Sequence, residues 1–122
     1  LMQSDIEIYV KNIGAPAAEQ WLQAMGWQTE ALILNRTTTK IVVTTGDRSF
    51  TVLAVSSGKF TSVWFQSDQT PWASDLECAR QAWQHFGKEV RSSQGGWQED
   101  NKDDRWWQLD DSGETLIDWS GY

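Results

Sequence analysis

Apolar and polar residues alternate at the start of the chain. In the segment 5–11, Ile6, Ile8 and Val10 occupy every second position, and the positions between them are polar or aromatic. Side chains of an extended strand point to opposite faces in turn, so this period of two predicts a strand with one buried face.

The next segment has the pattern of a helix. Gly14 and Pro16 stand at its start, and proline is tolerated in the first turn because its missing N–H is not needed there. Gly26 suits the helix end, since glycine adopts the left-handed conformation without strain. The residues expected to face the core are Ala18, Trp21, Leu22 and Met25.

Four strand-like segments follow, separated by turn residues. They cover residues 30–36, 40–45, 49–55 and 60–66, and the connections between them are only a few residues long. A parallel return needs a dozen residues or more, so connections this short require antiparallel neighbours. We therefore expect a four-stranded antiparallel meander.

A second helix is predicted after residue 74. Ser74 and Glu77 form a capping box, in which a hydroxyl and a carboxylate bond the unpaired amides of a helix start. Apolar residues then recur every three or four positions, which is one stripe along a helix. This stripe consists of Leu76, Ala79, Trp83, Phe86 and Val90. Residues 92–96 are interpreted as a flexible connection.

The chain closes with the pattern of a hairpin, in which segments 105–109 and 115–119 flank a turn sequence at 110–113. The fold class is therefore α+β: an antiparallel sheet of about six or seven strands, made of the central four-stranded meander, the C-terminal hairpin and the first strand, with two helices packed on it. Residues 1–122 form a single domain, in which residues 1–3 are expected to be a cloning remnant or a disordered start.

The charge of the chain is uneven, and the acidic surplus lies near the C-terminus. The 122 residues carry a formal net charge of −7, and the C-terminal acidic section, residues 94–122, holds eight acids against two bases. Nucleic acids and anionic membranes reward clustered lysine and arginine, so this balance argues against either as a partner. The section is also rich in tryptophan, which favours a folded segment over a disordered acidic tail.

The sequence offers few residues in patterns suited to catalysis or metal binding. The single cysteine, Cys78, and the single histidine, His85, are seven residues apart in the second helix, or about 10.5 Å along its axis, too far for a thiolate–imidazole pair. The acidic run 99–104 lacks the glycine and the final glutamate of an EF-hand calcium loop. No catalytic residue, metal or cofactor is therefore predicted. The absence of a signal-like start, together with the lone thiol, favours a cytoplasmic protein.

The nine tryptophans are the remaining signal. Trp106 and Trp107 are adjacent, so in a strand they must point to opposite faces of the sheet. Either both anchor the hairpin to the core, or one indole is exposed beside acids, where it could contact a cationic partner or stack on a sugar ring. The candidate binding residues are Trp97, Trp106, Trp107, Asp103 and Asp104.

Three functions remain open at this stage. The first is a non-catalytic protein-interaction module, such as an inhibitor or immunity-type binder of a basic protein, and it is the one the charge asymmetry favours. The second is a carbohydrate or small-ligand binder that uses an exposed tryptophan. The third is an enzyme whose site is assembled from residues far apart in the sequence, for which the candidates are Tyr9, Asp75, His85 and Tyr122. The sequence leaves the oligomeric state undetermined.

Overall fold

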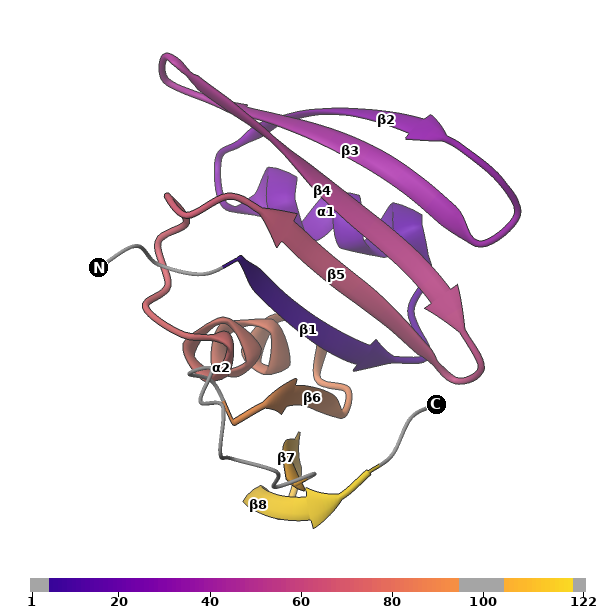
Figure 1. The fold of residues 1–122 in the computed structure, drawn as a ribbon, viewed down its shortest axis with the longest axis vertical. Coiled ribbons are helices and arrows are strands. Elements are labelled where there is room, and N and C mark those ends of the chain that lie inside the picture. Colours follow the sequence, from indigo (N-terminus) through magenta and orange to yellow (C-terminus); the bar gives the residue numbers. More distant parts are fainter. Residues whose placement is uncertain (1–4, 95–104, 120–122) are drawn as a thin grey trace, which may run out of the picture.

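The computed structural model describes residues 5–94 and 105–119 and has an α+β architecture. The elements are, in chain order, β1 (Ile6–Lys11), α1 (Ala15–Ala24), β2 (Gln28–Ile33), β3 (Thr38–Thr45), β4 (Arg48–Ser57), β5 (Phe60–Gln66), α2 (Asp75–Phe86), β6 (Val90–Ser93), β7 (Arg105–Asp110) and β8 (Gly113–Asp118). The strands form one open sheet in the order β2-β3-β4-β5-β1-β6-β7-β8 (Figure 1). Every neighbouring pair is antiparallel.

The central meander and the C-terminal hairpin predicted from the sequence are confirmed as β2–β5 and β7–β8. Within the described residues the sheet nevertheless has eight strands, where six or seven were expected. The additional strand is β6, which lies in the segment that was interpreted as the end of the second helix and a flexible connection. β6 pairs with β1 at Tyr9 and Val10, and on its other side it pairs with β7, so it links the hairpin to the rest of the sheet.

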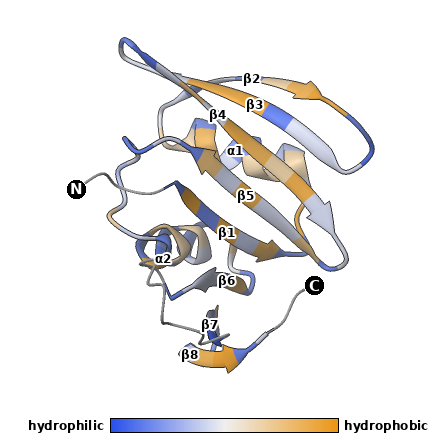
Figure 2. Ribbon diagram, in the orientation of Figure 1, coloured by the Kyte–Doolittle hydropathy of each residue, from blue (hydrophilic) through white to orange (hydrophobic). Residues whose placement is uncertain are grey.

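Both helices pack on the same face of the sheet, and the core lies between them and the strands. α1 contacts β2, β3 and β4, whereas α2 contacts β1, β6 and β7. The two helices meet at Trp21, whose ring lies 5.6 Å from that of Phe86. Figure 2 shows the same view coloured by hydropathy, with apolar residues along the central strands. The strand residues of the core are Ile6, Ile8, Val10, Ile41, Val43, Val52, Ala54, Val63, Phe65, Val90 and Leu109.

The second helix begins as predicted but ends earlier. The Ser74 hydroxyl accepts a hydrogen bond from the Glu77 N–H at 3.2 Å, which confirms the N-cap. The helix stops at Phe86 because Gly87 adopts the left-handed conformation, with φ of 64°. The placement of Val90 on the helical stripe was therefore wrong: it is the first residue of β6.

The buried face of α2 also differs from the predicted stripe. Its fully buried residues are Cys78, Ala79 and Ala82, while Trp83 and Phe86 are only half-buried at the edges of that face. Small side chains at the centre of the contact let the helix approach the strands closely. In the described residues no helix is both long and apolar enough to cross a membrane.

Candidate functional site

The β7–β8 hairpin is an integral part of the sheet. β7 pairs with β6 over four residues, from Val90 opposite Leu109 to Ser93 opposite Trp106. Trp107 is half-buried and packs against the core on the helix-covered face. Trp106 points to the other face, so the two adjacent indoles anchor the hairpin on both sides, one of the two alternatives drawn from the sequence.

An aromatic cluster covers part of the helix-free face, and its members are Tyr9, Phe60, Trp106 and Trp119. Edge-to-face contacts join Trp106 to Tyr9 at 5.5 Å and to Trp119 at 5.2 Å between ring centroids. Trp119 also contacts Phe60 at 5.1 Å. Tyr9 lies on the face of β1 opposite Ile6, Ile8 and Val10, yet it is only 9% exposed because these rings cover it. Aromatic pairs of this geometry contribute about 0.5–1.5 kcal/mol each beyond the area they bury.

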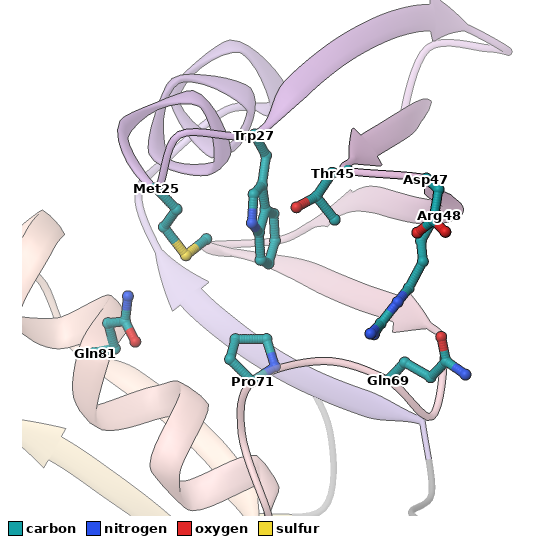
Figure 3. Close-up of a pocket in the computed structure, with 9 residues that line it drawn as sticks. Met25, Trp27, Thr45, Asp47, Arg48, Gln69, Pro71 and Gln81 are labelled. Carbon is teal, nitrogen blue, oxygen red and sulfur yellow. The ribbon is translucent and has the colours of Figure 1, made fainter.

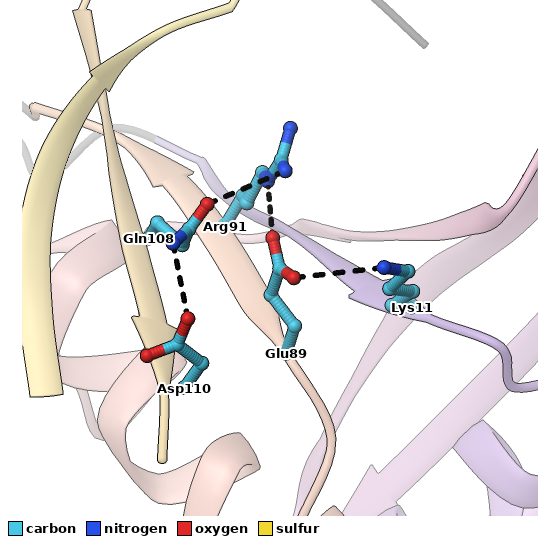
Figure 4. A network of polar contacts seen from close by, with 5 residues as sticks. All are labelled: Lys11, Glu89, Arg91, Gln108 and Asp110. Carbon is cyan, nitrogen blue, oxygen red and sulfur yellow. Dashed lines mark hydrogen bonds and ion pairs between the residues drawn. The ribbon is translucent and has the colours of Figure 1, made fainter. Parts of the chain in front are cut away.

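A cation lies against this cluster. The Arg91 guanidinium carbon is 4.8 Å from the Phe60 ring centroid and 4.6 Å from that of Trp119. Arg91 Nε also donates to Glu89 at 2.7 Å, and Glu89 is 3.7 Å from the Lys11 ammonium. Figure 4 shows this network continuing through Gln108 to Asp110 at the end of β7. The charges of the network are mutually compensated, so it fixes the hairpin and presents little net charge.

The acidic edge, defined here as Asp111, Glu114 and Asp118, lies on the outermost strand and the turn that precedes it. All three residues are exposed. Glu114 is bound by Arg80 of α2 through two hydrogen bonds of 2.7 and 3.0 Å, and these bonds lower its pKa. Asp111 and Asp118 form no ion pair with another residue in the described ranges. Arg80 therefore neutralises one of the three carboxylates of the edge.

Of the five candidate binding residues, the structure describes Trp106 and Trp107 only. Both are half-buried. Trp97, Asp103 and Asp104 lie outside the described residues.

A cavity of about 720 Å³ opens at the other end of the molecule, between the C-terminal end of α1, the β3–β4 turn and the loop before α2. Figure 3 shows the Trp27 ring facing this cavity, with Met25 and Pro71 beside it and the Arg48 side chain reaching inward. Gln81 of α2 lines the opposite side, and its carbonyl oxygen accepts a hydrogen bond from the Trp72 indole. Arg48 forms no ion pair with the described residues.

Two carboxyl groups lie near the start of α2. Asp75 accepts hydrogen bonds from the Glu7 backbone N–H at 3.3 Å and the Ser93 hydroxyl at 3.0 Å. Burial raises the pKa of Asp75, and it raises the pKa of Glu7, with a further contribution from the Asp75 charge. Burial, together with Asp75, also raises the pKa of Cys78 well above its ordinary value, so this thiol is not a nucleophile at neutral pH.

Of the residues named for an enzyme, the structure describes Tyr9, Asp75 and His85, and His85 lies apart from the other two. Tyr9 hydrogen-bonds Glu7, which places it near Asp75. His85 is ten positions further along α2, about 15 Å away along the axis, where its ring packs against Phe86 at 4.8 Å. Tyr122 lies outside the described residues. Within the described ranges, no group of three or more potential metal ligands occurs.

Sequence reasoning missed Trp27, Arg48 and Arg91. The cavity combines short segments from three separate loops, and nothing in the local sequence pattern brings these together. No protein-family model, curated protein or solved structure matches this chain.

Proposed function

We propose that this protein is a non-catalytic interaction module that binds a basic protein segment along its acidic edge. The observation that carries this proposal is the firm attachment of the β7–β8 hairpin to the sheet. Because Trp106 and Trp107 anchor it on both faces, the carboxylates of the turn and of β8 are held in fixed positions. Fixed charges attract a partner without the entropic cost of ordering a flexible tail.

The chemistry of the edge indicates the kind of partner. β8 is the last strand in the sheet order, so among the described residues one row of its backbone N–H and C=O groups has no strand beside it. An extended segment could pair with that row, as in strand-addition complexes. Asp111 and Asp118 would then attract lysine or arginine side chains, and complementary charge would speed the encounter. The indoles act as anchors of this surface and make little direct contact.

The test compares two double variants with equal charge. Asp111→Asn/Asp118→Asn removes two carboxylates from the acidic edge, and the control Asp47→Asn/Asp68→Asn removes two exposed carboxylates from loops elsewhere. The probe is an extended synthetic peptide that alternates lysine and threonine, and binding is measured by calorimetry at low and high salt.

We expect the edge variant to bind about tenfold more weakly, since each exposed ion pair contributes up to about 1 kcal/mol. The control should bind like the parent, and added salt should weaken binding of the parent. Equal losses of affinity in the two variants would mean that peptide binding depends on the net charge of the protein alone. That result, or no binding by the parent, would contradict the proposal.

The cavity beside Trp27 favours a second candidate function, the binding of a small ligand. Its volume of about 720 Å³ is within the range of ligand sites, and it combines an apolar wall of Trp27, Met25 and Pro71 with the cationic Arg48. A small aromatic carboxylate fits this combination, with its ring against the wall and its anion on the guanidinium. Indole-3-acetate and benzoate are suitable probes.

Binding of these probes is followed by ligand-observed NMR. Arg48→Gln should abolish the response to the carboxylates while Arg36→Gln, which changes an exposed arginine outside the cavity, should leave it intact. A response unchanged in Arg48→Gln would exclude this cavity as the carboxylate site.

A further inference from the structure

The opposite edge of the sheet carries an apolar patch that the proposed function does not use. Leu32, Ile33 and Leu34 are 60%, 76% and 50% exposed, and they are the exposed large hydrophobic residues of the described ranges. They are consecutive: Leu32 and Ile33 end β2, and Leu34 follows it. β2 is the first strand in the sheet order (Figure 2). Consecutive exposed apolar residues on an edge strand are typical of a strand-pairing site.

The backbone of β2 determines which groups are available for pairing. The Leu34 N–H donates to the Thr38 carbonyl at 2.9 Å, so the backbone groups of Leu34 point toward β3. The pairing direction alternates along an antiparallel strand. The N–H and C=O groups of Thr29, Ala31 and Ile33 therefore point away from the sheet, where none of the described strands lies beside them.

We infer that β2 pairs with β2 of a second copy of this chain, antiparallel about a two-fold axis at Ala31. In this register Ala31 lies opposite Ala31 of the second copy, and Thr29 lies opposite Ile33. All three outward-pointing residues then form hydrogen-bonded pairs, which uses every unpaired group of the strand. An axis at Ile33 would instead place Ala31 opposite Asn35, whose N–H already donates to Thr38.

The side chains of the helix-free face agree with this register. Leu32 lies opposite Lys40 of β3 within one copy. On its other side it would lie opposite Glu30 of the second copy. Glu30, Leu32 and Lys40 thus form a row across the interface, with opposite charges about 10 Å apart at their backbones, within reach of the lysine side chain. The two-fold axis generates this row twice.

Charge also selects β2 over β8 for self-pairing. A β8–β8 pair would bring two acidic edges together, whereas β2 carries one charged residue, Glu30. Seven strand spacings, about 33 Å along the sheet, separate the two edges, which is well beyond the screening length in physiological salt. The surplus negative charge therefore does not oppose pairing at β2.

One short strand from each copy would form this interface, so we expect it to bury less than the roughly 1,200 Å² of a standard complex and the dimer to dissociate in the micromolar range. Sedimentation equilibrium from about 5 to about 500 µM measures this association. The weight-average mass should rise from 13.9 kDa toward twice that value. A mass of one chain throughout, or growth beyond two chains, would overturn the inference.

Two substitutions at one position test the register. Leu32→Glu faces Lys40 within its own chain, and therefore preserves the monomer, but it faces Glu30 across the axis. Leu32→Lys removes the same apolar side chain and faces Glu30 with the opposite charge. Leu32→Glu should weaken association at least tenfold more than Leu32→Lys does.

A charge swap completes the test. Glu30→Lys/Leu32→Glu again places opposite charges across the axis, and it should restore association to within about threefold of Leu32→Lys. Circular dichroism of each variant establishes that the monomer is folded. Equal association of Leu32→Glu and Leu32→Lys, or no recovery in the charge swap, would refute the register.

Discussion

Truncation of Trp21 is expected to cause the largest loss of stability among the tryptophan variants. Trp21 is 1% exposed and lies where α1, α2 and the sheet meet. Its ring is 5.9 Å from Trp72, 6.1 Å from Phe65 and 5.6 Å from Phe86. Trp21→Ala removes the atoms that all three rings contact, and the rigid strands cannot close the space that remains.

The expected magnitude follows from burial. Truncation of a buried aromatic residue to alanine costs about 3–5 kcal/mol. A domain of this size has a total free energy of unfolding of about 5–15 kcal/mol, so the variant loses a large share of it. With a urea dependence of about 2 kcal/mol per molar, the unfolding midpoint should fall by about 2 M.

The matched control is Trp83→Ala. The sequence pattern places Trp83 at the centre of the helical stripe, but the structure places it half-buried beside a cavity of about 210 Å³. We expect a loss less than half that of Trp21→Ala, in proportion to the smaller area it buries. Urea unfolding is followed by far-ultraviolet circular dichroism, because both variants alter tryptophan fluorescence. A Trp83→Ala midpoint as low as that of Trp21→Ala would refute this placement of the core.

Three further outcomes follow from individual contacts. Trp83→Phe should change stability by less than about 0.5 kcal/mol in urea unfolding, because the buried indole N–H that it removes has no hydrogen-bond partner among the described residues; a loss equal to that of Trp83→Ala would contradict this. Ser74→Ala should cost about 1 kcal/mol by the same assay, since it removes the N-cap of α2, and an unchanged midpoint would mean that the cap is dispensable. The raised pKa values of Glu7 and Asp75 mean that the folded state binds protons more tightly than the unfolded state, so these groups lower stability as pH rises from the ordinary carboxyl range through the raised values. Asp75→Asn should flatten this dependence in urea midpoints measured between about pH 4 and 8, and an unaltered pH profile would show that Asp75 is not responsible.

Local signals predicted the parts of the fold that depend on local chemistry. The N-cap at Ser74 and the short turns of the meander act over a few residues, and both appear in the structure. β6 could not be predicted in the same way. Its four residues carry no strong strand signal of their own, and they form a strand because β1 and β7, distant in sequence, pair with them on both sides.

The interior of α2 shows a related limit of sequence patterns. Large apolar residues dominate a hydrophobic stripe, so the pattern favoured Trp83 and Phe86 as the centre of the contact. The structure buries Cys78, Ala79 and Ala82 there instead. Which face a helix buries depends on how closely it approaches the sheet, and small residues permit the closest approach. The candidate cavity has the same origin, because Trp27, Arg48 and Pro71 meet only through the tertiary fold.

The two edge strands of the sheet, β2 and β8, differ in how their side chains affect pairing with another strand. An edge strand exposes unpaired backbone groups, and charged side chains are a common protection against unwanted pairing. The carboxylates of the acidic edge would provide this protection even without a basic partner, so the two roles must be separated by their consequences. If protection were their only role, Asp111→Asn/Asp118→Asn would increase self-association and leave binding of the basic peptide unchanged.

β2 carries only Glu30 in its own sequence, with Leu32 and Ile33 exposed, so this edge is left for pairing. A dimer joined at β2 would present an acidic edge at each end of one continuous sheet, and it could therefore bind two basic segments at once.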